Sequence, residues 1–195
     1  MSAIHEHVLQ NGMTLLCWPQ RHLHGLEFGL YLKGGPLYET EETQGISNLL
    51  EHLCFRGLGG LNREGLLREL NRFGTNLDAA TYAEGLVFRL KCLPRFFDAA
   101  LEYFLRFLAN VPWTPEQIAA EKQVVLRQLE ADGDGDLFDR AACDFRKTEN
   151  GAFPPLGTPE SLMALTEADI QLWQEMIFQP QNACLVMTGN FSDGM

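Results

Sequence analysis

Residues 45–57 of this chain read GISNLLEHLCFRG. The apolar side chains in this segment recur at positions i, i+3, i+4, i+7 and i+8, which are Ile46, Leu49, Leu50, Leu53 and Cys54. That spacing is typical of an amphipathic helix with one buried face. We therefore predict a helix that starts at Gly45 and ends near Gly57.

The polar face of this predicted helix holds Asn48, Glu51 and His52, which share one side of the helix at i, i+3 and i+4. In zinc peptidases, side chains at i and i+4 bind the metal, and the carboxylate at i+3 is the general base for the metal-bound water. The pattern matches the inverted zinc motif H-x-x-E-H except at its first position, which is Asn48. A Glu-His pair on an amphipathic helix is also a common surface feature, so both interpretations stay open at this point.

The segments on either side of this helix predict a mixture of strands and helices. Before it, Asn11-Gly12 separates two short extended runs, which indicates a hairpin, and residues 26–32 alternate like a strand. After it, we predict helices over 62–73, 96–111, 114–129, 137–147 and 166–178, one or two strands over 76–93, and a last strand over 183–188. Strands at both ends with helices between them indicate an α+β domain with a mainly antiparallel sheet.

The composition argues against several classes of function. The 195 residues are 46% hydrophobic and 21% charged, as in folded globular chains. Fifteen Lys and Arg against 26 Asp and Glu give a formal net charge of −11, which repels nucleic acid and anionic lipid surfaces. No segment approaches the roughly 18 apolar residues of a membrane span. We therefore expect neither nucleic acid nor a membrane as a partner.

The cysteines and the N-terminal residues bear on the cellular compartment. The five cysteines are scattered and form no CxxC pair, so we interpret them as reduced and mostly buried. The first 20 residues have neither the basic start nor the continuous apolar run of a signal peptide. Together these features predict a cytoplasmic location.

Two further patterns suggest metal ions less strongly. The H-x-H pairs His5/His7 and His22/His24 would each present two imidazoles on one face of a strand, although such pairs are common on protein surfaces. The acidic run over 132–136 begins like a calcium-binding loop. Leu137 stands where that loop needs glycine, and Cys143 stands where it needs glutamate, so we expect no calcium site.

Taken as a whole, segment 45–57 resembles the zinc-site helix of the pitrilysin, insulinase and mitochondrial processing peptidase family. The sequence of that helix reads G-[IL]-A-H-F-L-E-H-M-L-F-K-G. Other segments resemble this family in the same order: the opening hairpin, Gly34-Gly35, residues 73–81 (FGTNLDAAT), 121–126 (EKQVVL), 156–160 (LGTPE) and 184–190. The resemblance covers almost the whole chain. It implies one pitrilysin-like domain over residues 1–191, with 192–195 as a tail or the start of a linker.

The resemblance also implies a role for each position of the site. Glu51 takes the position of the catalytic base, and Glu121 that of a supporting glutamate. Of the three zinc-ligand positions, only His52 keeps the family's residue, because the other two hold Asn48 and Gln128. Amide oxygens are poor ligands for zinc, which prefers imidazole, thiolate and carboxylate. We therefore expect no bound cofactor, no hydrolysis, and a hydrogen-bonded polar cluster of these side chains in place of the metal.

Members of the family join two or more such domains around a substrate peptide, and some pair an active subunit with an inactive one. The resemblance thus implies a non-catalytic domain that forms a peptide-binding chamber with an active protease subunit or a second domain of its kind. Its expected ligand is a peptide or unfolded polypeptide. Two alternatives remain. One is a zinc-dependent metalloendopeptidase whose altered site uses His52, Asn48 and a histidine of the H-x-H pairs, and the other is an interaction module that binds no peptide.

Overall fold

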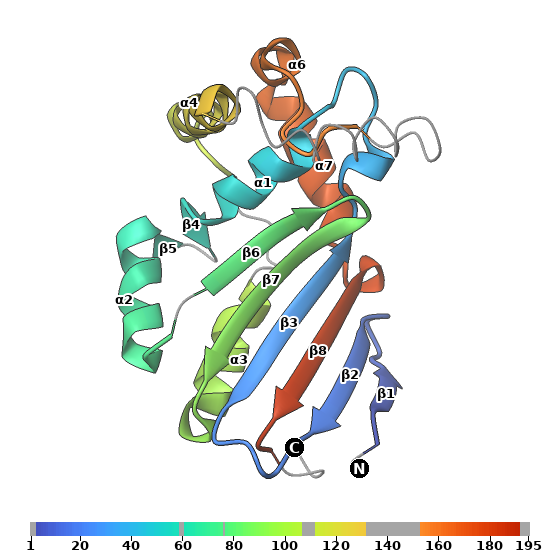
Figure 1. Ribbon diagram of the computed structural model, residues 1–195, viewed down its shortest axis with the longest axis vertical. Helices are drawn as coiled ribbons and strands as arrows, with labels where there is room; N and C mark the ends of the chain where they lie inside the picture. Colours follow the sequence, from blue (N-terminus) through green and yellow to red (C-terminus); the bar gives the residue numbers. More distant parts are fainter. Residues whose placement is uncertain (1–2, 59–60, 76, 107–111, 132–152, 192–195) are drawn as a thin grey trace.

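The computed structural model describes residues 3–58, 61–75, 77–106, 112–131 and 153–191. A sheet with the strand order β1-β2-β8-β3-β7-β6 forms its centre (Figure 1). The strands are β1 (His5–Val8), β2 (Thr14–Pro19), β3 (Leu26–Lys33), β6 (Leu77–Tyr82), β7 (Gly85–Cys92) and β8 (Ala183–Gly189). Strands β2 and β8 pair in parallel, and the other neighbouring pairs are antiparallel. The predicted α+β class with a mainly antiparallel sheet is confirmed.

The helices lie behind the sheet and around one of its ends (Figure 1). They are α1 (Ile46–Cys54), α2 (Arg63–Phe73), α3 (Phe97–Leu105), α4 (Pro115–Ala131), α6 (Pro159–Ala164) and α7 (Glu167–Ile177). Three short 3₁₀ turns cover Pro36–Tyr38, Pro94–Phe96 and Pro180–Asn182. Helix α3 packs behind the sheet, whereas α1, α4, α6 and α7 gather at the end where β6 and β7 are joined.

Two elements differ from the sequence prediction. After the helix that ends near Gly57, the sequence predicts no strand, but Gly57–Leu58 (β4) pairs with Leu61–Asn62 (β5) in a small two-stranded sheet. Residues 159–164 were not expected to be helical. A capping box between Thr158 and Ser161, with Pro159 in the first turn, starts α6 there.

The core lies between the sheet and its helices. Along β3 the buried side chains alternate with partly exposed ones, so Leu26, Phe28, Leu30 and Leu32 all face the helices. The Phe28 ring lies 5.6 Å from the Phe97 ring and 6.0 Å from the Phe104 ring, measured between centroids. These contacts hold α3 against the middle of the sheet.

The N-terminal end of α1 is held by close packing and hydrogen bonds. Gly45 has a φ of +83°, and a Cβ on it would lie 2.6 Å from the carbonyl oxygen of Leu156, so a larger residue does not fit there. The buried Glu39 carboxylate accepts hydrogen bonds from the backbone N–H groups of Gly45 (2.8 Å) and Ser47 (3.0 Å). The Ser47 hydroxyl accepts a hydrogen bond of 3.1 Å from Trp173 Nε1 on α7. Helix α1 is therefore tied to two distant parts of the chain.

Helix α4 is fixed at its start and along one side. Thr114 and Gln117 form reciprocal hydrogen bonds that cap its N-terminus, at the start of the helix predicted over 114–129. Lys122 donates hydrogen bonds to the carbonyl oxygens of Met163 and Leu165, at the C-terminal end of α6. The helix expected over 137–147, the acidic run over 132–136 and the tail over 192–195 lie outside the described residues.

Candidate functional site

The candidate site lies where α1 meets α4 and the edge strand β6. The polar residues of α1 that the sequence singled out are Asn48, Glu51 and His52. The α1 positions that face the sheet, Leu49, Leu50 and Leu53, are fully buried. Because the apolar face is anchored in this way, the orientation of the polar face is set by the core.

Glu51 points toward β6. Its carboxylate accepts a hydrogen bond of 2.5 Å from the Thr81 hydroxyl. Burial raises the pKa of Glu51 above its usual value, although the Thr81 hydrogen bond and the nearby His52 partly oppose this. A half-buried carboxyl with a raised pKa is suited to proton transfer.

His52 and Arg56 point toward α4, where both meet Glu121. The His52 Nδ1 atom lies 3.5 Å from Glu121 Oε2, and the Arg56 guanidinium forms an ion pair with Glu121 Oε1. Glu121 is only 5% exposed. Burial by itself raises its pKa, but hydrogen bonds from His52 and Arg56 and their charges outweigh burial and leave the pKa of Glu121 below its usual value. Glu121 is therefore held as a carboxylate.

Asn48 and Gln128 do not join this cluster. Asn48 is 8% exposed, and its Oδ1 atom is buried without a hydrogen-bond partner among the described residues. Gln128 lies on α4 two turns beyond Glu121, with an exposed side chain. The expectation that Asn48 and Gln128 would satisfy a polar cluster is therefore wrong. The hydrogen bonds of the site come instead from Thr81 and Arg56.

A comparison with models of protein families matches the part of the chain that holds this site. A family model described as Insulinase (Peptidase family M16) matches residues 24–142, which contain α1, the edge strand β6 and α4. This chain belongs to the insulinase family of peptidases.

Two curated relatives of this insulinase-family chain cover most of its length. An uncharacterized zinc protease from Rickettsia felis is 26% identical over 185 residues, which are 93% of this chain and 45% of that protein. The mitochondrial-processing peptidase subunit beta of Caenorhabditis elegans is 27% identical over 146 residues, which are 73% of this chain and 32% of that protein. The chain thus spans less than half the length of these relatives.

Solved structures share the fold of this insulinase-family chain. A protease from Helicobacter pylori superimposes with a TM-score of 0.89 at 21% identity, covering 98% of this chain and 47% of that one. A peptidase M16 inactive domain from Pseudomonas fluorescens superimposes with a TM-score of 0.86 at 17% identity, covering 97% and 47%. Within the described residues of our chain, no helix is long and apolar enough to cross a membrane.

The zinc chemistry of the insulinase family needs a set of ligands that these positions do not supply. Across the described part of the chain, no group of three or more His, Cys, Asp or Glu side chains is placed to hold a metal ion. Asn48 offers only an amide in place of imidazole, and Gln128 offers one in place of carboxylate. The Arg56 cation already pairs with Glu121. The residues present do not fit the three-ligand zinc site of the family.

Sequence reasoning missed the roles of Arg56 and Thr81. Arg56 stands at the position of a lysine in the quoted family motif, and this signal could have found it. The pairing of Thr81 with Glu51 crosses from strand to helix and has no comparable local signal.

The other candidate ligands lie apart from the site. His5, His7, His22 and His24 are all exposed, and none contacts Glu51 or Glu121. Cys54 is buried on α1, and burial raises the pKa of its thiol well above the usual range. It therefore acts as a packing residue, as expected for a reduced cysteine. Cys17, Cys92 and Cys184 are also free.

Proposed function

We propose that this chain is a non-catalytic insulinase-family domain that forms part of a peptide-binding chamber with an active protease subunit or a sister domain. The observation that carries the proposal is the state of the ligand positions. Asn48 and Gln128 are neutral amides, Gln128 is exposed, and the Arg56 cation pairs with the buried Glu121.

Without a metal, the buried Glu121 still has a compensating charge. A buried carboxylate needs a compensating positive charge, because an unpaired buried charge is strongly destabilising. In this chain the guanidinium of Arg56 supplies that charge to Glu121. Water has a pKa near 15.7 in bulk and about 7 only when bound to a metal such as zinc. Glu51 alone is therefore a poor catalyst of peptide hydrolysis.

The edge strand next to the site supports the proposal that the ligand is a peptide. Among the described residues, strand β6 ends the sheet and pairs only with β7. Its other edge offers backbone N–H and C=O groups to an extended chain, which is a common mode of peptide recognition. Thr81 of β6 bonds to Glu51, so a peptide lying along this strand would pass beside the remnant of the catalytic site.

The relatives support a partner of the same kind. The chain spans 45% of the Rickettsia felis zinc protease and 47% of the Helicobacter pylori protease, which leaves room in those proteins for a second unit of similar size. The Caenorhabditis elegans relative is named as a subunit, and the Pseudomonas fluorescens structure is described as an inactive domain. Within this proposal residues 1–191 act as one domain in the cytoplasm.

The zinc content of the purified chain tests the proposal. After dialysis against metal-free buffer, elemental analysis should find far less than one zinc per chain. One zinc retained per chain would contradict a non-catalytic role. Binding of fluorescent peptides, measured by anisotropy, tests the peptide-binding part separately. If no peptide binds, the chain is better described as an interaction module.

One observation favours the alternative of a zinc-dependent metalloendopeptidase with an altered site. Glu51 and His52 keep the base and ligand positions of the motif, and Glu121 lies beside His52. The alternative predicts cleavage of a random peptide pool that stops when a chelator is added. We expect no cleavage with or without the chelator.

A further inference from the structure

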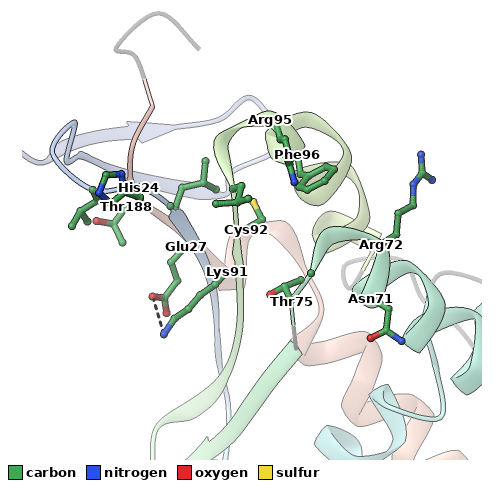
Figure 2. Close-up of a pocket in the computed structure, with 16 residues that line it drawn as sticks. His24, Glu27, Asn71, Arg72, Thr75, Lys91, Cys92, Arg95, Phe96 and Thr188 are labelled. Carbon is green, nitrogen blue, oxygen red and sulfur yellow. Dashed lines mark ion pairs between the residues drawn. The ribbon is translucent and has the colours of Figure 1, made fainter.

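A cavity of about 580 Å³ lies at the end of the sheet where β3 begins and where β7 and β8 end. Figure 2 shows the turn with Arg95 and Phe96 above it, Lys91 and Cys92 on one side, and the C-terminal part of α2 with Asn71 and Arg72 on the other, with Thr75 in the middle. The cavity is distinct from the candidate site, because none of its lining residues belongs to the cluster around Glu51 and Glu121.

The lining of this cavity is positively charged although the chain as a whole is acidic. Its basic side chains are His24, Arg72, Lys91 and Arg95, and its acidic side chain is Glu27, which pairs with Lys91 at 3.8 Å. An adjoining opening shares Asn71, Gly74, Thr75 and Lys91 with the cavity and adds Asp78. Arg72, Lys91 and Arg95 against Glu27 and Asp78 leave one formal positive charge in these lining residues, in a chain of formal net charge −11. Such a region attracts anions.

Arg95 is the basic group best prepared to receive an anion. Its guanidinium lies 4.8 Å from the centroid of the Phe96 ring, which restrains the side chain without neutralising it. Among the described residues, no carboxylate forms an ion pair with Arg95. Arg72 is less available, since its Nη1 atom lies 3.5 Å from Glu69 Oε2, in a pair whose side chains are 70% and 33% exposed.

Other features of the cavity favour part of a peptide over a simple inorganic ion. Leu23, Leu26, Leu93 and Phe96 supply apolar wall, and Thr75, Thr188 and Asn71 supply polar groups. The volume lies within the range of pockets that accept organic ligands. Planar guanidinium groups match the geometry of a carboxylate.

The position of the cavity relates it to the proposed peptide path. Asp78, in the adjoining opening, precedes Thr81 by three residues on β6. Three strand residues span about 10 Å. An extended peptide that passes Glu51 along β6 therefore reaches the opening that adjoins the basic cavity after about three of its own residues.

We propose that this cavity is a subsite that binds a carboxylate of the bound peptide, either an acidic side chain or the C-terminal carboxylate. The inference rests on the proposed peptide-binding function and adds a charge preference to it. Arg95 supplies the main contact, and Arg72 and Lys91 add to the positive field around it.

Three labelled octapeptides test the subsite by fluorescence anisotropy at low ionic strength with the full 195-residue chain. Each carries a neutral N-terminal fluorophore. The first has two glutamines near an amidated C-terminus, the second has glutamates in their place, and the third has the glutamines with a free C-terminal carboxylate. We expect the second or the third to bind about tenfold more tightly than the first, because a charge-assisted hydrogen bond is lost in the first. The comparison of the second with the third identifies which carboxylate the cavity binds.

Matched variants assign the preference to the cavity. Arg95→Gln should reduce the tenfold preference to less than about threefold. Lys33→Gln is the control, because Lys33 also lies over an aromatic ring, that of Tyr38 at 5.5 Å. It stands at the other end of β3, about 23 Å from Leu26, beyond the reach of screened charges. Both residues are exposed, so neither change removes core packing.

The outcomes separate the subsite from the proposed function. Equal binding of all three peptides would overturn the subsite and leave peptide binding in place. A charge preference that survives Arg95→Gln, or that Lys33→Gln removes equally, would also overturn the subsite. If no peptide binds at all, the proposed function itself fails, and the subsite fails with it.

Discussion

At the N-terminal end of α1 the buried side chains of Glu39 and Ser47 have hydrogen-bond partners, whereas the side-chain oxygen of the next residue, Asn48, has none among the described residues. Glu39 accepts two backbone hydrogen bonds, and Ser47 accepts one from Trp173. Asn48 directly follows Ser47 and is almost as deeply buried, yet its Oδ1 atom has no partner in the described part of the chain. An unpaired buried acceptor costs about 1–3 kcal/mol of stability.

This difference in hydrogen bonding indicates that the start of α1 and the face with Asn48 have different roles. The N-terminal end of α1 is built as a structural anchor, with each polar group satisfied by a residue from another element. The face with Asn48 keeps a polar residue at a cost in stability, and such residues are typical of functional sites. In the proposed function, this face is the family's zinc site with two of its ligand positions changed.

The largest expected effect comes from restoring the ligands of that face. Asn48→His with Gln128→Glu should bind zinc at least about a hundredfold more tightly than the natural chain, because each regained ligand adds several kcal/mol and about 1.4 kcal/mol is already tenfold. Competition with a chromophoric chelator measures the affinity.

A matched control locates this effect on α4. In Asn48→His with Gln123→Glu the new carboxylate stands two residues from Glu121, on the opposite side of the helix, and should add nothing beyond the single histidine. Equal zinc affinity of the restored variant and the natural chain would show that positions 48 and 128 do not face a common site.

Removal of the anchor at the start of α1 should have the next largest effect. Glu39→Ala leaves the N–H groups of Gly45 and Ser47 without their acceptor, so we expect the free energy of unfolding in urea to fall by about 2–3 kcal/mol. Glu39→Gln keeps one acceptor oxygen and should lose less. The control Glu41→Ala, at an exposed neighbour, should change stability by less than about 0.5 kcal/mol. A loss as large at Glu41 would refute the anchoring role of Glu39.

A smaller loss is expected at the second anchor. Ser47→Ala leaves the buried Trp173 Nε1–H group without an acceptor and should lower the free energy of unfolding by about 1–2 kcal/mol. In a double-mutant cycle with Trp173→Phe, the combined change should cost less than the sum of the single changes. Simple additivity would mean that this hydrogen bond contributes nothing.

The smallest effect is expected at Asn48 itself. Asn48→Ala removes the unpaired amide and introduces the residue with the highest helix propensity, and both gains offset the lost packing. We expect the free energy of unfolding to change by less than about 1 kcal/mol, in either direction. A loss above about 2 kcal/mol, as at Glu39, would mean that Asn48 is an anchor too and would remove the contrast between the two regions.

The sequence was sufficient where structure depends on neighbours along the chain. The period of the apolar residues in 45–57 located α1, the Asn11-Gly12 turn located the first hairpin, and Thr114 and Thr166 marked the starts of α4 and α7. These features arise within about one helical turn or one tight turn, so local spacing predicts them. The same limitation explains the errors, because β4 and β5 have no distinctive local period.

The candidate site could be predicted only in part. The resemblance to the family named Glu51, His52 and Glu121, and the structure brings His52 and Glu121 together. The exposed position of Gln128 and the unpaired oxygen of Asn48 depend on how α1 and α4 pack, which no local pattern contains. Glu39 lies in none of the elements that the sequence predicts, yet it is buried and accepts hydrogen bonds from the start of α1.

What the amino-acid sequence determined by itself was the order and type of most elements and the family, and from the family it proposed that two zinc-ligand positions are replaced. Only the tertiary structure decided which polar groups are paired. The Arg56–Glu121 pair joins residues 65 apart in the chain, and the Ser47–Trp173 hydrogen bond joins residues 126 apart. Hydrogen bonds and ion pairs act over a few ångströms, so their partners are set by the folding of the whole domain and not by spacing along the chain.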